Sequence, residues 1–314
     1  MEDMMDMTRI KNSVVMVGSY AVMSGTQDDD VLYPPKSRSF IDGLGGADVV
    51  DYSSSDYSLT ITPNSVDDLI VSVNGQQKDL LRNIERVIGS SADDRMIGAS
   101  TNEVFLGGLG RDTLDGGAGF DGADYSDKDK PVEVDLSVQG PIVAKVGGQE
   151  EDTLHNMEAV IGGLAGDTLT AAAGKSLLAG GEGNDTLIAN GGDDILMGGR
   201  GADIFVFKSV ADSPFNDPSR ITDFDYAEGD RIDLSAIDAN ASQDGFQALA
   251  FSDESPAAHS VWYSVGADYG LWYAPPAIRV DVTGDAAEDM MIFVETCSDL
   301  PFHITAAGLG LVAE

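Results

Sequence analysis

The sequence predicts an all-β fold: a right-handed parallel β-roll, or solenoid, of nonapeptide repeats that ends in a β-rich cap. Glycine and acidic residues recur every nine residues, and apolar residues keep one phase of that period. The chain of 314 residues also has 37 glycines and a formal charge of −36. So much like charge destabilises a compact chain unless cations bind it, and it repels nucleic acid and anionic lipid. We therefore expect cations, and no nucleic acid, among the partners.

The repeats form three arrays, at residues 25–51, 89–124 and 162–206, with twelve units in all. The clearest consecutive units are GGLGRDTLD from Gly107 and GGAGFDGAD from Gly116. Position six is acidic in ten of the twelve units, where composition alone would place about two. Position eight is apolar in every unit: Leu32, Ile41, Val50, Met96, Phe105, Leu114, Ala123, Leu169, Leu178, Leu187, Leu196 and Phe205. A flexible low-complexity linker would show no such phase.

The composition of each unit predicts its shape. Six glycine-rich residues can form a tight turn with positive φ angles, and the next three form a short strand whose middle residue faces inward. One such strand cannot bury its apolar residue alone, so the units must stack. Two units make a coil of about 18 residues, and turns 18 residues apart then lie one above the other.

Stacked turns bring carboxylates and glycine carbonyls together in an oxygen-only environment, which suits several Ca²⁺ ions better than Mg²⁺. The 18-residue rule pairs Asp30 with Asp48, Asp94 with Asp112, Glu103 with Asp121, Asp167 with Asp185, Asp185 with Asp203, and Ser176 with Asp194. The last pair has one carboxylate and should be the weakest. The expected carbonyl donors are turn glycines: Gly107, Gly108, Gly110, Gly116, Gly117, Gly119, Gly180, Gly181, Gly183, Gly198, Gly199 and Gly201. The alternative is that position six only solvates the turn.

The units GGLGRDTLDGGAGFD and GGEGNDTLI resemble the RTX, or haemolysin-type, calcium-binding repeat. This resemblance implies a parallel β-roll with Ca²⁺ between its turns. It also implies export by type I secretion machinery and a secreted, extracellular location, with the cell surface as one such place.

Two inserts, 52–88 and 125–161, separate the arrays and repeat each other at an offset of 73 residues: Asp51-Tyr52-Ser53 recurs as Asp124-Tyr125-Ser126. Both contain alternating apolar and polar residues, which predict strands, and we expect enlarged coils of the roll rather than independent domains. Residues 1–24 are expected to be an N-terminal cap or leader. Glu2, Asp3 and Asp6 precede the apolar stretch from Ser13 to Met23, whereas a signal peptide begins with a basic region, and this favours a cap strand over a signal peptide.

Residues 207–314 are expected to cap the roll and carry the secretion region. RITDFDYAEGDRIDLSAID, at 220–238, resembles the C-terminal cap of serralysin-type metalloproteases, and an open roll end needs covering. VDVTGDAAED, at 280–289, loosely resembles a calcium loop but lacks the glycine and glutamate of an EF-hand. Trp262-Tyr263 and Trp272-Tyr273 could stack on a sugar, although hairpin packing is the simpler interpretation.

No catalytic residues are expected. The three histidines lack metal-ligand spacing and there is no GxSxG elbow. Two functions therefore compete. One is a non-enzymatic, secreted calcium-binding protein with a structural or surface role, whose extracellular partner the sequence does not identify. The alternative is the export and folding module of a secreted protease, epimerase or lipase. The 24 residues before the repeats are too few for a catalytic domain, which favours the first.

Overall fold

The computed structural model describes residues 13–17, 19–240, 242–252, 255–264 and 276–296. Among these residues there is no α-helix, and one 3₁₀ turn, η1 (Val210–Asp212), accompanies 28 strands. None of the described residues forms a helix long and apolar enough to cross a membrane. The chain divides into two compact units, the first comprising Met1–Asp127, Gly140–Lys145 and Gln149–Ala159, and the second comprising the remainder.

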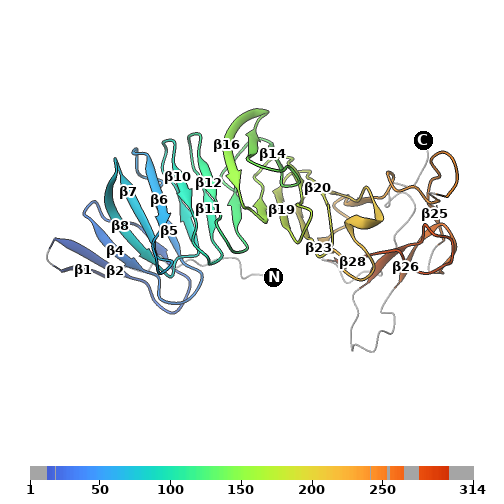
Figure 1. Cartoon of the computed structure of the whole chain (residues 1–314), viewed down its shortest axis with the longest axis horizontal. Helices are drawn as coiled ribbons and strands as arrows, with labels where there is room; N and C mark the ends of the chain where they lie inside the picture. The colour runs from blue at the N-terminus through green and yellow to red at the C-terminus, as the bar shows by residue number, and fades with distance from the viewer. Residues whose placement is uncertain (1–12, 18, 241, 253–254, 265–275, 297–314) are drawn as a thin grey trace. The chain divides into compact units, whose positions relative to one another are not determined.

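The first unit consists of two rows of strands that run side by side (Figure 1). One row has the order β1 (Ser13–Val17), β2 (Tyr20–Ser24), β4 (Ser39–Asp42), β8 (Gln76–Arg82), β7 (Leu69–Val73), β6 (Leu59–Pro63), β10 (Arg95–Ile97), β12 (Thr113–Asp115), β16 (Gln149–His155) and β15 (Ile142–Val146). The other has the order β3 (Val31–Leu32), β5 (Val49–Asp51), β9 (Arg86–Ile88), β11 (Val104–Leu106) and β13 (Gly122–Asp124).

Parallel pairing in this unit follows the 18-residue period. Strand β10 pairs with β12 through Met96 and Leu114, and β3 pairs with β5 through Leu32 and Val50. The first insert stays in the same row, because β8 is parallel to β4 and β6 is parallel to β10, while β7 fills the space between them as an antiparallel strand. Strand β1 adds an antiparallel hairpin strand beyond β2.

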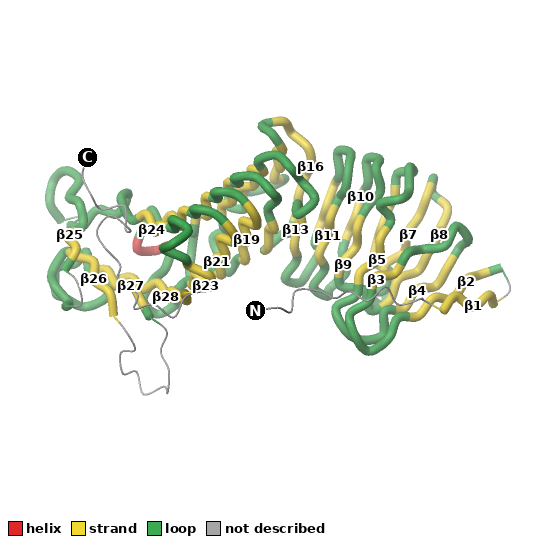
Figure 2. The backbone as a smooth tube through the Cα atoms, turned by 180° about the vertical axis from the view of Figure 1, so that it is seen from behind, coloured by secondary structure: helices red, strands yellow, loops and turns green. Residues whose placement is uncertain are grey.

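The second unit again has two rows of strands, whose turns appear as loops in Figure 2. One row is β14 (Val132–Asp135), β18 (Thr168–Thr170), β20 (Thr186–Ile188), β22 (Ile204–Val206) and β24 (Arg231–Asp233). The other is β17 (Ala159–Ile161), β19 (Leu177–Glu182), β21 (Ile195–Arg200), β23 (Arg220–Phe224), β28 (Met290–Thr296), β27 (Ala277–Val280), β26 (Ser260–Ser264) and β25 (Ala250–Phe251).

The parallel stack continues past residue 206, where the nine-residue pattern in the sequence ends. Phe205 of β22 pairs with Ile232 of β24, and Leu196 of β21 pairs with Ile221 of β23, at spacings of 27 and 25 residues. Strand β28 then pairs with β23, and β27 and β26 follow as antiparallel strands. The cap thus begins as two irregular repeats and covers one end of a row with a meander.

The core lies between the two rows of strands in each unit. All twelve position-eight residues are at most 1% exposed, although three-residue strands are too short to bury them without neighbours. The predictions of an all-β fold, of 18-residue coils and of an inward-facing position eight are therefore confirmed.

Candidate metal centres

The position-six residues form continuous hydrogen-bonded columns. In each of the six predicted pairs, the backbone N–H of the first residue donates to the side chain of the acid 18 residues later. The donor–acceptor distances run from 2.7 Å for Asp167 to Asp185 to 3.0 Å for Ser176 to Asp194. One carboxylate oxygen, Oδ1, is used in every pair, and these acids are nearly fully buried. The structure therefore brings every predicted pair together.

Five further acids extend the columns and were not predicted as site residues: Asp79, Glu85, Asp152, Glu158 and Asp230. Each accepts the backbone N–H of the preceding position-six residue at 2.8–3.0 Å. A local signal existed for one of them, since Asp152-Thr153-Leu154 repeats the tripeptide found at residues 112–114 and 185–187.

The second carboxylate oxygen distinguishes two kinds of turn. In the first kind, the N–H of position two donates to the acid of its own unit, as Thr26 does to Asp30 and Gly163 does to Asp167. In the second kind, position two has a positive φ and its N–H does not reach the carboxylate. In the turns of Asp48, Asp121, Asp185 and Asp203, the buried Oδ2 atom then has no hydrogen-bond partner among the described residues.

The Oδ2 atoms of Asp48, Asp121 and Asp185 lie beside backbone carbonyls, as the turn of Asp185 illustrates. A Cβ built on Gly180 would lie 2.2 Å from Asp185 Oδ2 and 2.6 Å from the carbonyl oxygen of Gly198. Two oxygens thus crowd one point, and glycine is required there because any side chain would fill it. Oxygens that face each other without a hydrogen atom repel, and a cation between them would remove the repulsion.

The other predicted glycines shape the turns. Those at positions two and four have φ between 88° and 154°: Gly108, Gly110, Gly117, Gly119, Gly181, Gly183, Gly199 and Gly201. Stacking is also close, since a Cβ on Gly199 would lie 2.0 Å from the carbonyl oxygen of Gly181. At position one, Gly107, Gly116 and Gly198 repeat the arrangement of Gly180, with the carboxylate of their own unit against the α-carbon.

Burial raises the pKa of several carboxyl groups in the columns. The pKa of Asp185 is raised to about 7, first by desolvation and then by the charges of Asp203 and Asp167. Burial also raises the pKa values of Asp194 and Asp230 to about 7 and that of Asp48 to about 6, and nearby acids add to each shift. Without a cation, the column resists full ionisation at neutral pH, so a bound cation would have to displace protons.

The donor set fits calcium rather than a transition metal. Within the described residues, no three His, Cys, Asp or Glu side chains gather closely enough to hold a metal by themselves. A site here would combine carboxylates of stacked turns with backbone carbonyls. Calcium accepts six to eight such oxygens in flexible geometry, whereas soft or imidazole-preferring metals want sulfur or nitrogen. Ser176 supplies only a hydroxyl to its column. This hydroxyl accepts the Ala172 N–H and donates to the Gly174 carbonyl.

The loop at 280–289 is organised by its own backbone. Asp281 is fully buried and accepts N–H bonds from Gly284 and Ala286, while Asp289 accepts from Val282 and Thr283. Burial by itself would raise the pKa of Asp281. The hydrogen bonds that Asp281 accepts outweigh this effect and hold its pKa below the ordinary value. The two acids therefore cap the loop.

The tryptophan pair was considered for sugar stacking. Trp262 lies in β26 with 2% of its surface exposed, so it packs in the core. Trp272-Tyr273 lies outside the described residues.

Comparison with known proteins identifies two regions. Residues 86–123 match the RTX calcium-binding nonapeptide repeat (4 copies), and residues 146–298 match the Peptidase M10 serralysin C terminal family. No curated protein matches the chain. A solved structure, the AlgE6R3 subunit of the Azotobacter vinelandii mannuronan C5-epimerase in solution, is 21% identical over 72% of this chain and 89% of its own, with a TM-score of 0.26. Neither matched family model describes a catalytic domain.

The spacing, the paired carboxylates and the two matches agree. This chain carries calcium-binding RTX nonapeptide repeats, and residues 146–298 match the serralysin C-terminal family.

Proposed function

We propose that the chain is a secreted calcium-binding protein whose roll folds when Ca²⁺ binds outside the cell, with a structural role at a surface or in a matrix. The observation that carries this proposal is that the buried Oδ2 atoms of Asp48, Asp121, Asp185 and Asp203 have no hydrogen-bond partner in the part of the chain that the structure describes. An isolated buried carboxylate costs several kcal/mol, so such a column is stable only when protonated or neutralised by cations. The formal charge of −36 adds a repulsion that cations would relieve.

Calcium supplies charge neutralisation and extra oxygen coordination at these turns. The residues proposed to hold it are the position-six acids and the carbonyls of the turn glycines, including Gly107, Gly116, Gly180 and Gly198. The chain's own part is to hold these oxygens in place: each Oδ1 is fixed by a backbone N–H, which leaves Oδ2 aimed into the turn.

The same energetics support an extracellular location. At a Kd of about 0.1 mM and about 1 mM Ca²⁺, one site contributes roughly 1.4 kcal/mol, and five independent sites contribute about 7 kcal/mol. At sub-micromolar calcium the contribution is close to zero. A chain that stays unfolded in the cytosol can be threaded through a type I exporter and can fold outside.

A second function is favoured by the serralysin C-terminal match over residues 146–298. In that case the chain is the export and folding module of a secreted enzyme. The chain can be joined to a reporter enzyme. Measuring whether calcium binding and export of the fusion still depend on the repeats would distinguish a module from a stand-alone protein.

The central test compares circular dichroism and small-angle X-ray scattering of the whole chain in a chelator, in 1–10 mM Ca²⁺ and in equal Mg²⁺. We expect a loss of β-type dichroism and an increase in radius of gyration in the chelator, restored by calcium and hardly by magnesium. A chain equally compact in all three conditions would refute the calcium switch.

A further inference from the structure

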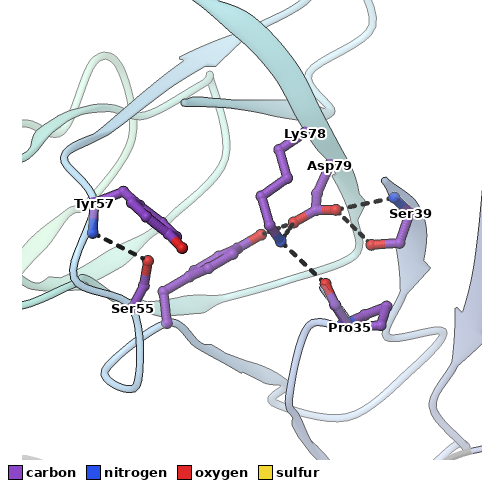
Figure 3. Close-up of polar contacts among 7 residues, drawn as sticks. Pro35, Ser39, Ser55, Tyr57, Lys78 and Asp79 are labelled. Carbon is purple, nitrogen blue, oxygen red and sulfur yellow. Dashed lines mark hydrogen bonds and ion pairs between the residues drawn. The ribbon is translucent and has the colours of Figure 1, made fainter. Parts of the chain in front are cut away.

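A cavity of about 460 Å³ lies on the first unit, away from the carboxylates of the turns described above. Its walls come from the turn at 34–36, from residues between 51 and 57 at the end of β5, and from Lys78 of β8 (Figure 3). The volume falls within the range of about 300–1,000 Å³ that is typical of small-molecule sites. The cavity is therefore large enough to hold a ligand.

Lys78 is a fixed part of the cavity wall. Its Nζ donates to Asp79 Oδ2 at 2.6 Å and to the Pro35 carbonyl at 3.3 Å, and it lies 5.2 Å from the centroid of the Tyr52 ring. Asp79 is fully buried and also accepts the Ser39 backbone N–H at 3.0 Å and the Tyr52 hydroxyl at 2.9 Å. An ammonium has three N–H donors, and the two acceptors use two of them. The third can donate to an oxygen that enters the cavity, without any rearrangement of the side chain.

Tyr57 adds an aromatic surface to the same cavity (Figure 3). The residue is 56% exposed, although most of a tyrosine side chain is apolar. Pro34 and Pro35 contribute half-buried apolar surface nearby. A tyrosine offers a ligand a flat face and a polar hydroxyl at a small cost in conformational entropy. The cavity thus combines an apolar platform with fixed polar groups.

The roll does not require these lining residues. Strand β6 pairs with β10 in the same register as β14 pairs with β18, 73 residues later, so the two inserts join the stack in the same way. Tyr57 is nevertheless replaced by Lys130 at that offset, and Pro34-Pro35 by Gly107-Gly108. The aromatic and proline surface is therefore particular to the first insert, which favours a role other than building the coil.

The charges of the lining disfavour ionic and purely apolar ligands. Lys36 and Lys78 balance Asp51 and Asp56, and Asp79 already neutralises Lys78 from behind. An anion would meet two carboxylates and a chain of formal charge −36, whereas a cation would meet a fixed ammonium. A purely apolar ligand would remove charged groups from water without giving them hydrogen bonds. A neutral ligand with hydroxyl groups fits best, because a hydroxyl can donate to a carboxylate and accept from an ammonium.

We propose that this cavity binds a neutral saccharide, with a sugar ring against Tyr57 and with sugar hydroxyls bonded to Lys78 and Asp56. This inference deepens the proposed role at a surface or in a matrix and rests on it, because such a site would attach the folded roll to extracellular glycans. Lys78 is fixed before the ligand arrives, so binding has little ordering cost at that wall.

The test is saturation-transfer NMR of the full chain in calcium. The probes are neutral oligosaccharides of glucose, mannose, galactose and N-acetylglucosamine, beside sulfated and uronic-acid oligosaccharides. We expect saturation transfer to at least one neutral probe and little to the anionic ones. Transfer to none of the neutral probes, or to anionic probes alone, would overturn the proposal. Circular dichroism in calcium and in chelator, recorded without saccharide, tests the proposed calcium-dependent folding separately.

Three variants assign the binding to this cavity. Tyr57→Ala should weaken binding of the responding saccharide by about tenfold, whereas Tyr57→Phe keeps the ring and should retain most of the affinity. Tyr226→Ala is the matched control, because Tyr226 is similarly exposed, at 57%, but belongs to the second unit and should leave binding unchanged. If Tyr57→Ala does not fold, Asp56→Ala at an exposed position still decides. Full affinity in the folded Tyr57→Ala or Asp56→Ala variant would show that the saccharide binds elsewhere.

Discussion

Replacing Asp185 with asparagine should change the stability of the protein in opposite directions with and without calcium. The Asp185 carboxylate accepts the backbone N–H of Asp167 through Oδ1, and the backbone N–H of Asp185 donates to the Asp203 carboxylate. Asp185 therefore lies between two neighbours of one column. Its Oδ2 has no partner and lies next to the Gly198 carbonyl. In calcium this oxygen is a proposed ligand, and without calcium it is a buried negative charge facing another oxygen.

The sizes follow from the pKa and from mass action. A carboxyl group whose pKa is raised from 3.8 to about 7 destabilises the calcium-free fold at pH 8 by at most about 4 kcal/mol when ionised. Asparagine removes that charge, keeps an oxygen for the Asp167 N–H and directs an amide N–H toward Gly198. In calcium, by contrast, it weakens the two sites that share Asp185, at a cost of about 3 kcal/mol if each contributes about 1.4 kcal/mol.

The assay is urea unfolding at pH 8, followed by circular dichroism, in calcium and in chelator. An excluded osmolyte such as sucrose can bring the calcium-free chain into its folding transition. Asp79→Asn is the matched control, because Lys78 and Tyr52 already satisfy that carboxylate, so it should destabilise the protein in both conditions. If Asp185→Asn destabilises equally with and without calcium, the unpartnered oxygen is not a cation ligand.

Two further predictions concern pH and export. Because the pKa values of Asp48, Asp185, Asp194 and Asp230 are higher in the folded chain than in the unfolded one, the calcium-free protein should lose stability as pH rises from about 4 to about 7 and change little above. Calcium affinity should rise over the same range. Calorimetric titration with calcium at pH 6, in two buffers of different ionisation enthalpy, should detect proton release on binding. Binding heats that do not depend on the buffer would contradict this. Deleting residues 207–314 should abolish secretion through a type I exporter, and undiminished protein in the medium would show that the signal lies elsewhere.

The repeat itself was predictable because one short pattern fixes both its turn and its core. Position eight must be apolar to be buried between the rows, and position six must accept the N–H of the neighbouring turn. Both residue types therefore recur every nine residues in the sequence. A spacing of 18 residues then sets the register without any long-range information, as the Met96–Leu114 pair illustrates.

The cap and inserts were less predictable because their spacing is irregular. Ile221 and Ile232 continue the stack after gaps of 25 and 27 residues, so no fixed period reveals them. Asp79 and Asp230 act as position-six acids, but the residues before them do not form the glycine-rich turn that identifies a unit. Only tertiary pairing shows that they belong to the columns.

Whether the second carboxylate oxygen of a position-six acid has a partner within the protein depends on residues outside the position itself. Where the N–H of position two can reach the carboxylate, as at Ser90 and Asp94, the turn is satisfied within the protein. A positive φ at position two turns that N–H away, as at Gly181 and at Leu44, and Oδ2 is left facing carbonyls. A third solution is a charged neighbour, which Lys78 provides for Asp79. Position six thus marks where the column runs, whereas position two and the adjoining insert decide whether the second carboxylate oxygen has a hydrogen-bond partner within the protein.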